Sequence, residues 1–298
     1  MSDSLLYLDP HALAKVQSMD LVAKLVVEGF ITGLHKSPYH GFSVEFAEHR
    51  QYIPGDPFKH VDWKLFGKSD RLYVKTYEQE TNLRAHILLD VSASMGYASP
   101  GNITKFKYAS FLGAALSYMM LRQQDAVGLL TFRDRIETII PPRAVPRHLR
   151  VLLRELEKTQ PSSTTAMAGA LHEMAERISR RGLVVLISDL MDDPEEVMDA
   201  LKHFRHRQHE VVVFHVLDPH EIEFPFQEEV AFVDMETNEE LMTHPWEVAK
   251  EYRKRLAEWS ENYKTLCLQN RIEYERLSTS TPFDVALMSY LEKRKKLH

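Results

Sequence analysis

Short apolar runs alternate with longer amphipathic stretches along most of the chain from residue 83 onward. Continuous aliphatic and β-branched runs predict strands that are buried on both faces of a sheet. Apolar residues at helical spacing predict helices that cover the sheet. The expected strands are Ala85–Val91, Val127–Phe132, Arg135–Ile140, Leu183–Ser188, Val211–Leu217 and Ile272–Leu277. The expected helices are Phe106–Leu121, Arg147–Glu157, Met167–Ser179, Glu195–His206, Pro245–Gln269 and Phe283–Lys296.

This alternation predicts an α/β fold with a doubly wound, mostly parallel open sheet of the Rossmann-like kind, because right-handed crossovers join parallel strands in that way. The main domain is expected at residues 83–298, with an insertion at about 219–245. Ala231–Asp234 and Glu240–Met242 predict a hairpin within the insertion. Residues 1–82 are expected to form a smaller segment, a helix over Leu13–Phe30 and then a β-rich part, that packs on the main domain.

Composition narrows the class of protein. The chain has 298 residues, 44% of them hydrophobic, and a formal net charge of -6, so its charge gives no reason to expect a nucleic-acid partner. Cys267 is the only cysteine, which excludes an intrachain disulfide and a cysteine-based zinc site. The start lacks a signal-peptide pattern, and no apolar run is long enough to span a bilayer. We therefore expect a cytoplasmic protein without a transmembrane segment.

Side chains with oxygen atoms gather in three loops beside the expected strands. The first loop is 90–94, the second is 162–165 and the third is Ser188–Asp189. Because the carboxyl ends of parallel strands meet at one edge of a sheet, these loops are expected to come together. Carboxylates and hydroxyls without histidine or cysteine suit a hard cation, Mg²⁺ or another divalent ion such as Mn²⁺ or Ca²⁺. Three hydroxyls and two carboxylates would leave a coordination position open for an acidic residue of a protein partner.

At these loops the chain resembles the von Willebrand factor A fold with its metal-ion-dependent adhesion site, over about Leu83–His298. In that family the first loop supplies an aspartate and two serines, the second a threonine and the third an aspartate. Two departures are visible: Ser162 and Ser163 replace the usual glycines, and Leu190 stands where a glycine often follows the aspartate. The metal ligands that this resemblance implies are Asp90, Ser92, Ser94, Thr165 and Asp189, with Thr164 as a further candidate.

Nearly the whole chain is also similar to a bacterial family, the one numbered fifty-eight among the domains of unknown function. Its motifs occur in order along the sequence. The resemblance implies a cytoplasmic protein that is often encoded beside an AAA+ ATPase of the MoxR type and works with it. Other members often carry membrane helices. The matching segments are Gly33-Leu34-His35 with Ser37, Glu45-Phe46, 50–56, 61–64, 74–78, Phe224-Pro225-Phe226 and Ser280-Thr281-Pro282.

The oxygen-rich loops and the two resemblances together predict a non-enzymatic, metal-ion-dependent protein-interaction module. We expect an adaptor or co-chaperone whose partner is a MoxR-type AAA+ ATPase or the substrate of that ATPase. No GxxxxGK[ST] motif is present, so ATP hydrolysis would have to come from the partner.

Other interpretations remain open. A metal-dependent phosphohydrolase would use Asp90 as nucleophile and an acid two residues later, but Ser92 stands at that position. Nucleic-acid binding rests only on scattered basic residues such as Arg177, Arg180 and Arg181. His203 and His206 are adjacent on a helix, but such a pattern is more typical of a solvated face than of a metal site. Asp192-Asp193 precedes Pro194, so a helix N-cap is favoured over metal binding there.

Overall fold

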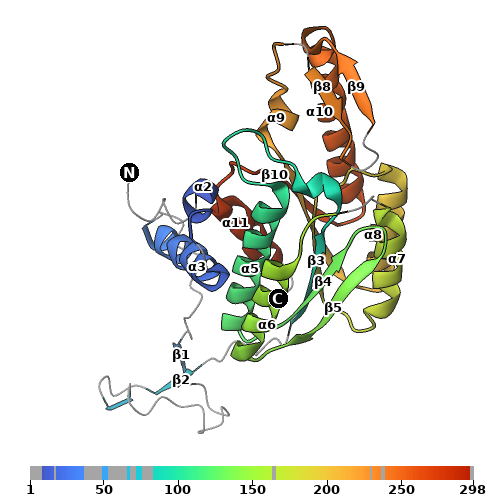
Figure 1. The fold of residues 1–298 in the computed structure, drawn as a ribbon. Coiled ribbons are helices and arrows are strands. Elements are labelled where there is room, and N and C mark those ends of the chain that lie inside the picture. The colour runs from blue at the N-terminus through green and yellow to red at the C-terminus, as the bar shows by residue number, and fades with distance from the viewer. Residues whose placement is uncertain are drawn as a thin grey trace. The chain divides into compact units, whose positions relative to one another are not determined.

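The computed structural model describes residues 9–16, 18–36, 49–52, 66–67, 72–75, 83–162, 166–228, 230–235 and 239–295. The chain divides into two compact units (Figure 1): residues 1–33 with 83–298, and residues 34–82. In the smaller unit, β1 (His49–Gln51) and β2 (Tyr73–Lys75) pair in antiparallel fashion. Much of the upstream family motif, including residues 53–60, lies outside the described residues. That residues 34–82 pack on the α/β domain stays a prediction.

The larger unit is built on a six-stranded sheet with the strand order β10-β7-β6-β3-β4-β5. All neighbouring strands are parallel except β4 and β5, which are antiparallel. The prediction of a doubly wound, mostly parallel α/β fold is therefore confirmed. The strands are β3 (Arg84–Asp90), β4 (Ala126–Phe132), β5 (Ile136–Arg143), β6 (Leu183–Ser188), β7 (Glu210–Leu217) and β10 (Glu273–Ser278).

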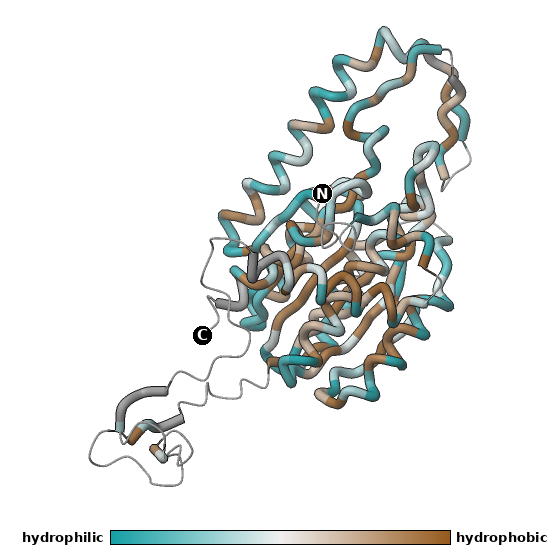
Figure 2. Tube along the Cα trace, turned by 90° about the vertical axis from the view of Figure 1, so that its left-hand side faces the viewer, coloured by the Kyte–Doolittle hydropathy of each residue, from teal (hydrophilic) through white to brown (hydrophobic). Residues whose placement is uncertain are grey.

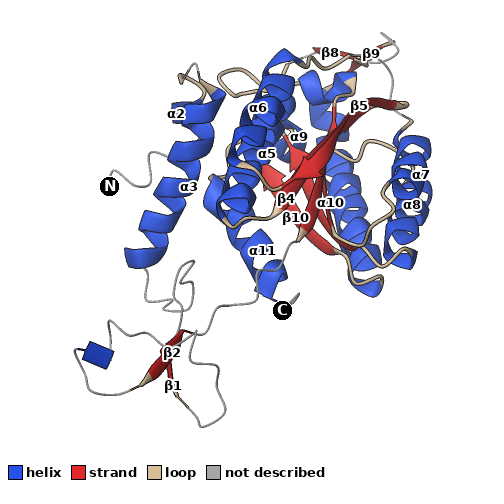
Figure 3. Ribbon diagram, turned by 90° about the horizontal axis from the view of Figure 1, so that it is seen from below, coloured by secondary structure: helices blue, strands red, loops and turns tan. Residues whose placement is uncertain are grey.

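Helices cover both faces of this sheet (Figure 3). One face carries α5 (Lys105–Arg122), α6 (Leu149–Lys158) and α11 (Phe283–Lys295), and the other carries α7 (Met167–Arg177), α8 (Pro194–His206) and α10 (Pro245–Gln269). The central strands are hydrophobic along their length (Figure 2), and every residue of β6 is buried. Burial on both faces explains why these strands are continuous apolar runs instead of alternating ones.

The N-terminal helix differs from the prediction. A single helix over Leu13–Phe30 was expected, but α2 (Pro10–Leu13) ends early and α3 (Met19–Lys36) begins after a break. Ser18 accounts for the restart, since its hydroxyl accepts a hydrogen bond from Leu21 N at 3.4 Å. The two helices contact the α/β core: Lys107 Nζ donates to Ala14 O at 3.2 Å, for example.

Strand β5 also differs from the expected one, which ended before Pro141-Pro142. The observed strand continues through both prolines to Arg143 at the edge of the sheet. An edge strand tolerates proline because one side of its backbone has no strand to donate to. Its close approach requires Gly128 on β4, where an added β-carbon would lie 2.7 Å from Ile140 O.

The insertion predicted at about 219–245 contains the expected hairpin, formed by β8 (Val230–Val233) and β9 (Glu240–Thr243). It also contains α9 (Pro219–Glu223), a helix that the sequence pattern did not predict. A capping box explains α9: the Asp218 side chain accepts from the first turn, and Glu221 accepts from Asp218 N at 2.7 Å. Within the described part of the chain, none of the helices has the length and apolar character needed to cross a membrane.

Candidate functional site

The first and third oxygen-rich loops lie side by side at the carboxyl edge of the sheet. Leu89 of β3 pairs with Ile187 of β6, so Asp90 and Ser188 follow at neighbouring strand ends. From β3 the chain continues to β4 on one side, and it later returns to β6 on the other side. Ligand sites in open α/β sheets form where the winding direction reverses in this way. The structure therefore brings Asp90 and Asp189 together, as the sequence predicts.

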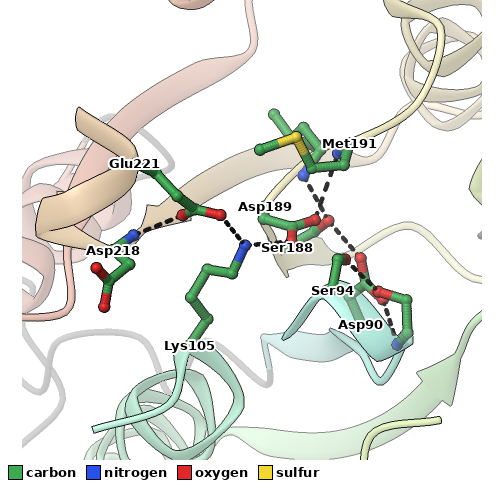
Figure 4. Close-up of polar contacts among 10 residues, drawn as sticks. Asp90, Ser94, Lys105, Ser188, Asp189, Met191, Asp218 and Glu221 are labelled. Carbon is green, nitrogen blue, oxygen red and sulfur yellow. Dashed lines mark hydrogen bonds and ion pairs between the residues drawn. The ribbon is translucent and has the colours of Figure 1, made fainter. Parts of the chain in front are cut away.

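Asp90 is fully buried and is held by two hydrogen bonds. Its Oδ1 accepts from Ser92 N at 2.9 Å, and its Oδ2 accepts from the Ser188 hydroxyl at 2.6 Å. Leu190 N in turn donates to Ser188 Oγ at 2.9 Å. Ser188 is therefore a positioning residue, because it connects the Asp90 carboxylate to the backbone of the third loop (Figure 4).

The two serines of the first loop face each other. Ser92 precedes a short 3-10 helix, η2 (Ala93–Gly96), and Ser94 lies within it. Their hydroxyl oxygens are 3.1 Å apart, with Ser92 fully buried and Ser94 partly exposed. The first loop thus presents the carboxylate and both hydroxyls that the predicted cation site requires.

Asp189 pairs with Lys105, a partner that the sequence pattern did not predict. Lys105, only 1% exposed at the first position of α5, places Nζ 2.8 Å from Asp189 Oδ2 and 2.6 Å from Glu221 Oε1. Asp189 Oδ1 also accepts from Met191 N at 3.3 Å. One sequence signal pointed to Lys105: a cation at a helix N-terminus opposes the helix dipole, so its presence calls for a local anion.

Burial and charge set the protonation of this group. Burial raises the pKa of Asp90 to about 7, and the nearby negative charge of Asp189 adds to the effect. Burial would also raise the pKa of Asp189, but the Lys105 ammonium outweighs it and holds that pKa below its usual value. The pKa of Glu221 is raised by burial despite its contact with Lys105. The Lys105 ammonium thus compensates the negative charge of Asp189 more fully than it compensates those of Asp90 and Glu221.

Of the second loop the structure describes only Ser162, because residues 163–165, with Thr164 and Thr165, lie outside the described residues. Ser162 N donates to Val91 O at 3.0 Å, which connects the start of the second loop to the first loop. After it, Met167 N donates to Asp192 Oδ2 at 2.8 Å, which ties the other flank to the third loop. That Thr165, or Thr164, joins the site stays a prediction.

Leu190 explains why a glycine is usual after the third-loop aspartate. Its φ is +55°, in the left-handed region that favours glycine, yet its side chain is fully buried in the core on the α7 and α8 side of the sheet. Apolar burial therefore holds a strained backbone in place beside Asp189.

The other sequence candidates have structural roles or lie elsewhere. Asp193 is the N-cap of α8, accepting from Glu195 N at 2.8 Å, as expected. His203 lies away from these loops, with its Nδ1 3.3 Å from Nδ1 of His172. Over the described ranges, no group of three or more His, Cys, Asp and Glu side chains could hold a metal ion. A cation at the sheet edge would therefore need the serine hydroxyls as well as Asp90 and Asp189.

The donor set fits a hard divalent cation. It consists of carboxylate and hydroxyl oxygens, the ligands that Mg²⁺ prefers. The described network contains three carboxyl groups, those of Asp90, Asp189 and Glu221. Its one described cation is the Lys105 ammonium, so the carboxyl groups outnumber the positive charges. One Asp189 oxygen already bonds to Lys105, so a cation would approach Asp189 from its remaining lone pairs.

Comparison with known families gives a match over most of the chain. The model of a family described as "Protein of unknown function DUF58" matches residues 48–262. Among curated proteins, the chain is 27% identical over 233 residues to "Uncharacterized protein Rv1480" of Mycobacterium tuberculosis, covering 77% of this chain and 72% of that protein. "Uncharacterized protein Mb1516" of Mycobacterium bovis matches to the same extent, at 27% identity over 77% of this chain and 72% of its own.

Several solved structures resemble the chain at low sequence identity. An aerotolerance-related membrane protein from Bacteroides fragilis has a TM-score of 0.48 at 18% identity, over 72% of this chain and 99% of that chain. The hypothetical protein BatB from Bacteroides thetaiotaomicron has a TM-score of 0.46 at 17% identity over the same shares, 72% and 99%. The SpRpn10 VWA domain has a TM-score of 0.40 at 10% identity, over 70% and 94%.

Proposed function

The chain belongs to the DUF58 family, and from this starting point we propose that it is a non-enzymatic, metal-ion-dependent protein-interaction module of the cytoplasm. In this proposal Asp90, Ser92, Ser94 and Asp189 hold a Mg²⁺ ion together with Thr165. The bound ion would supply an open coordination position for a carboxylate of a protein partner. The observation that carries the proposal is the meeting of two buried carboxylates and two hydroxyls at the switch point of the sheet.

Charge supports the proposal. Burying a carboxylate without a counter-charge costs several kcal/mol, and proteins avoid it unless a partner or a metal compensates. Lys105 is directed at Asp189 and Glu221, while the donors to Asp90 among the described residues, Ser92 N and the Ser188 hydroxyl, are neutral. A divalent cation held by Asp90 and Asp189 would compensate the negative charge of Asp90, and it would share Asp189 with Lys105.

The surface beside the loops supports a protein as the partner. Met235, from the loop of the β8–β9 hairpin, lies over the first loop, since its Cε would be 3.5 Å from a β-carbon added to Gly96. Exposed apolar side chains near a polar site are typical of protein-interaction surfaces. The exposed apolar residues just after the third loop, in the hairpin and at the start of α10 are Met191 (37%), Val233 (52%), Met235 (44%), Leu241 (65%), Met242 (69%), Trp246 (53%) and Val248 (38%).

Titration with Mg²⁺ tests the metal. Calorimetry should give a saturable isotherm for the native chain, and Asp90→Asn should weaken the binding by at least about tenfold because a charged ligand is lost. Asp199→Asn is the matched control, since it removes a surface carboxylate that pairs with Lys202. Asp189→Asn serves as a second variant, and circular dichroism verifies folding. Equal isotherms for the native chain and both site variants would overturn the assignment.

We further propose that the partner is a MoxR-type AAA+ ATPase or its substrate and that it contributes the acidic ligand. A pull-down from native bacterial lysate, with Mg²⁺ and with EDTA, should retain such a protein only with Mg²⁺. Loss of the same protein with Asp90→Asn, but not with Asp199→Asn, would connect the capture to the site. Retention that is equal in EDTA would contradict metal-dependent binding.

The alternative function, a metal-dependent phosphohydrolase, has a separate test. Ser92 occupies the position of the required second acid and is buried against Ser94. Glu221, a further acid of this network, is bonded to Lys105 and Asp218 N. We therefore expect no Mg²⁺-dependent release of phosphate from p-nitrophenyl phosphate. Release that disappears in Asp90→Asn would replace the interaction module with an enzyme.

A further inference from the structure

A cavity of about 530 Å³ lies at the opposite edge of the sheet from the candidate metal site. Arg84 and His86, at the start of β3, form one wall, while Asp90 ends the same strand. Leu130 of β4, residues 139–142 of β5 and residues 177–180 at the end of α7 complete the lining. The volume falls in the range of pockets that hold small organic ligands.

The charged part of the lining is cationic. Arg84, Arg177 and Arg180 all border the cavity, although the chain as a whole has a net charge of -6. Arg177 pairs with Glu173 through Nη2, whereas neither Arg84 nor Arg180 makes an ion pair with any residue that the structure describes. Two guanidinium groups are therefore available to an anion, and the planar fork of arginine suits phosphate and carboxylate oxygens.

His86 is a further polar group without a described partner on the cavity wall. Its side chain is only 8% exposed, it borders the cavity, and it has no hydrogen-bond partner within the described segments. An imidazole without a described protein partner at a cavity wall is free to hydrogen-bond to solvent or to a ligand in the cavity. Burial, with the charges of His209 and Arg84, lowers the pKa of His86 to about 4, which leaves a neutral ring able to donate one hydrogen bond.

The remaining wall is apolar. Ile139, Ile140, Pro141 and Pro142 of β5 line it together with Leu130, which pairs with Ile139 in the sheet, and with Ile178. A small inorganic anion would leave this wall uncovered. An apolar body would be attracted to the wall but would leave the arginines unpaired.

We propose that this cavity binds a small organic phosphate monoester, with the phosphate at Arg84 and Arg180 and an apolar body against β5. Two guanidinium charges match the two charges of a phosphate monoester. The imidazole of His86 would donate to a phosphate oxygen. This site is independent of the Mg²⁺ site proposed above.

The test uses 1-naphthyl phosphate as the probe and the full chain in EDTA. Calorimetry should show one saturable site, and Arg180→Gln should weaken binding at least about tenfold, since a charged hydrogen bond is lost. Arg181→Gln is the matched control, because this neighbouring arginine does not line the cavity. We expect its affinity to stay within about twofold of the native value. Arg84→Gln is a second variant, and its fold is verified by circular dichroism.

Other ligands separate the outcomes. 1-Naphthol and inorganic phosphate should each bind at least about tenfold more weakly than the probe, because each uses only one part of the lining. Equal losses in Arg180→Gln and Arg181→Gln would overturn the proposal in favour of a general surface charge. If inorganic phosphate bound as tightly as the probe, the cavity would be a simple anion site, and the proposal would also be overturned. Binding only to phosphatidic acid vesicles, or only to a single-stranded oligonucleotide, would replace it with a lipid or nucleic-acid surface.

Discussion

Lys105→Met should destabilise the fold by about 3–5 kcal/mol, because it leaves two buried carboxylates without their counter-charge. Asp189 is fully buried and Glu221 is 17% exposed, and both bond to the same ammonium group at 2.8 and 2.6 Å. Methionine preserves most of the apolar stem of lysine, so the change isolates the charge. Urea unfolding in EDTA measures the loss without interference from a bound metal.

Two further variants make the Lys105 result specific. Lys158→Met removes an ammonium group from a side chain that is 76% exposed, and it should change the free energy of unfolding by less than about 0.5 kcal/mol. The double variant Lys105→Met with Glu221→Gln should recover part of the loss, because one uncompensated carboxylate is then removed. A loss below about 1 kcal/mol in Lys105→Met would show that Asp189 and Glu221 find other compensation.

Gly182→Ala should cost about 3 kcal/mol, close to the upper end of overpacking in a core. A β-carbon at Gly182 would lie 2.2 Å from the carbonyl oxygen of Arg84, and the obstacle is backbone that cannot rotate away. Gly182 is also anchored on its other side, since its carbonyl accepts from Glu210 N at 3.0 Å. Relief therefore requires the starts of β3 and β6 to separate.

Gly169→Ala is the control, and it should change stability in the opposite direction. Gly169 lies within α7 with no atom within 4 Å of an added β-carbon, so alanine should stabilise the helix by about 0.5–1 kcal/mol. Urea midpoints of the two variants give both values from the same measurement. Two changes of the same sign would contradict the packing seen around Gly182.

The sequence pattern predicted the buried strands and the loops at their ends, because a continuous apolar run is enough to define such a strand. The buried strands β3, β6 and β7 were expected within one residue of their observed ends, because continuous apolar runs admit few alternatives. Asp90 and Ser188-Asp189 were placed at one sheet edge by the same logic, since parallel strands deliver their ends together. What they bind was not decided by this step.

Features that depend on contacts between distant residues were missed. Lys105 and Glu221 are 116 residues apart and meet only after α5 and α9 dock at the sheet edge. Likewise, Arg84 and Arg180 border one cavity because the end of α7 reaches the start of β3. In the sequence, Arg180 was one of several scattered basic residues with no defined partner. The pattern along a single helix or strand cannot predict contacts of this kind, because they depend on how whole elements pack against one another.

The two prolines in β5 have a consequence for how molecules of this protein associate. A free sheet edge can pair with a strand of another chain, and such pairing leads to open-ended polymers. β5 is the terminal strand on its side, and Pro141 and Pro142 carry no backbone N–H to donate to an incoming strand. The interruption falls within the strand itself. Growth of fibres by strand addition is thereby disfavoured at this edge of the sheet.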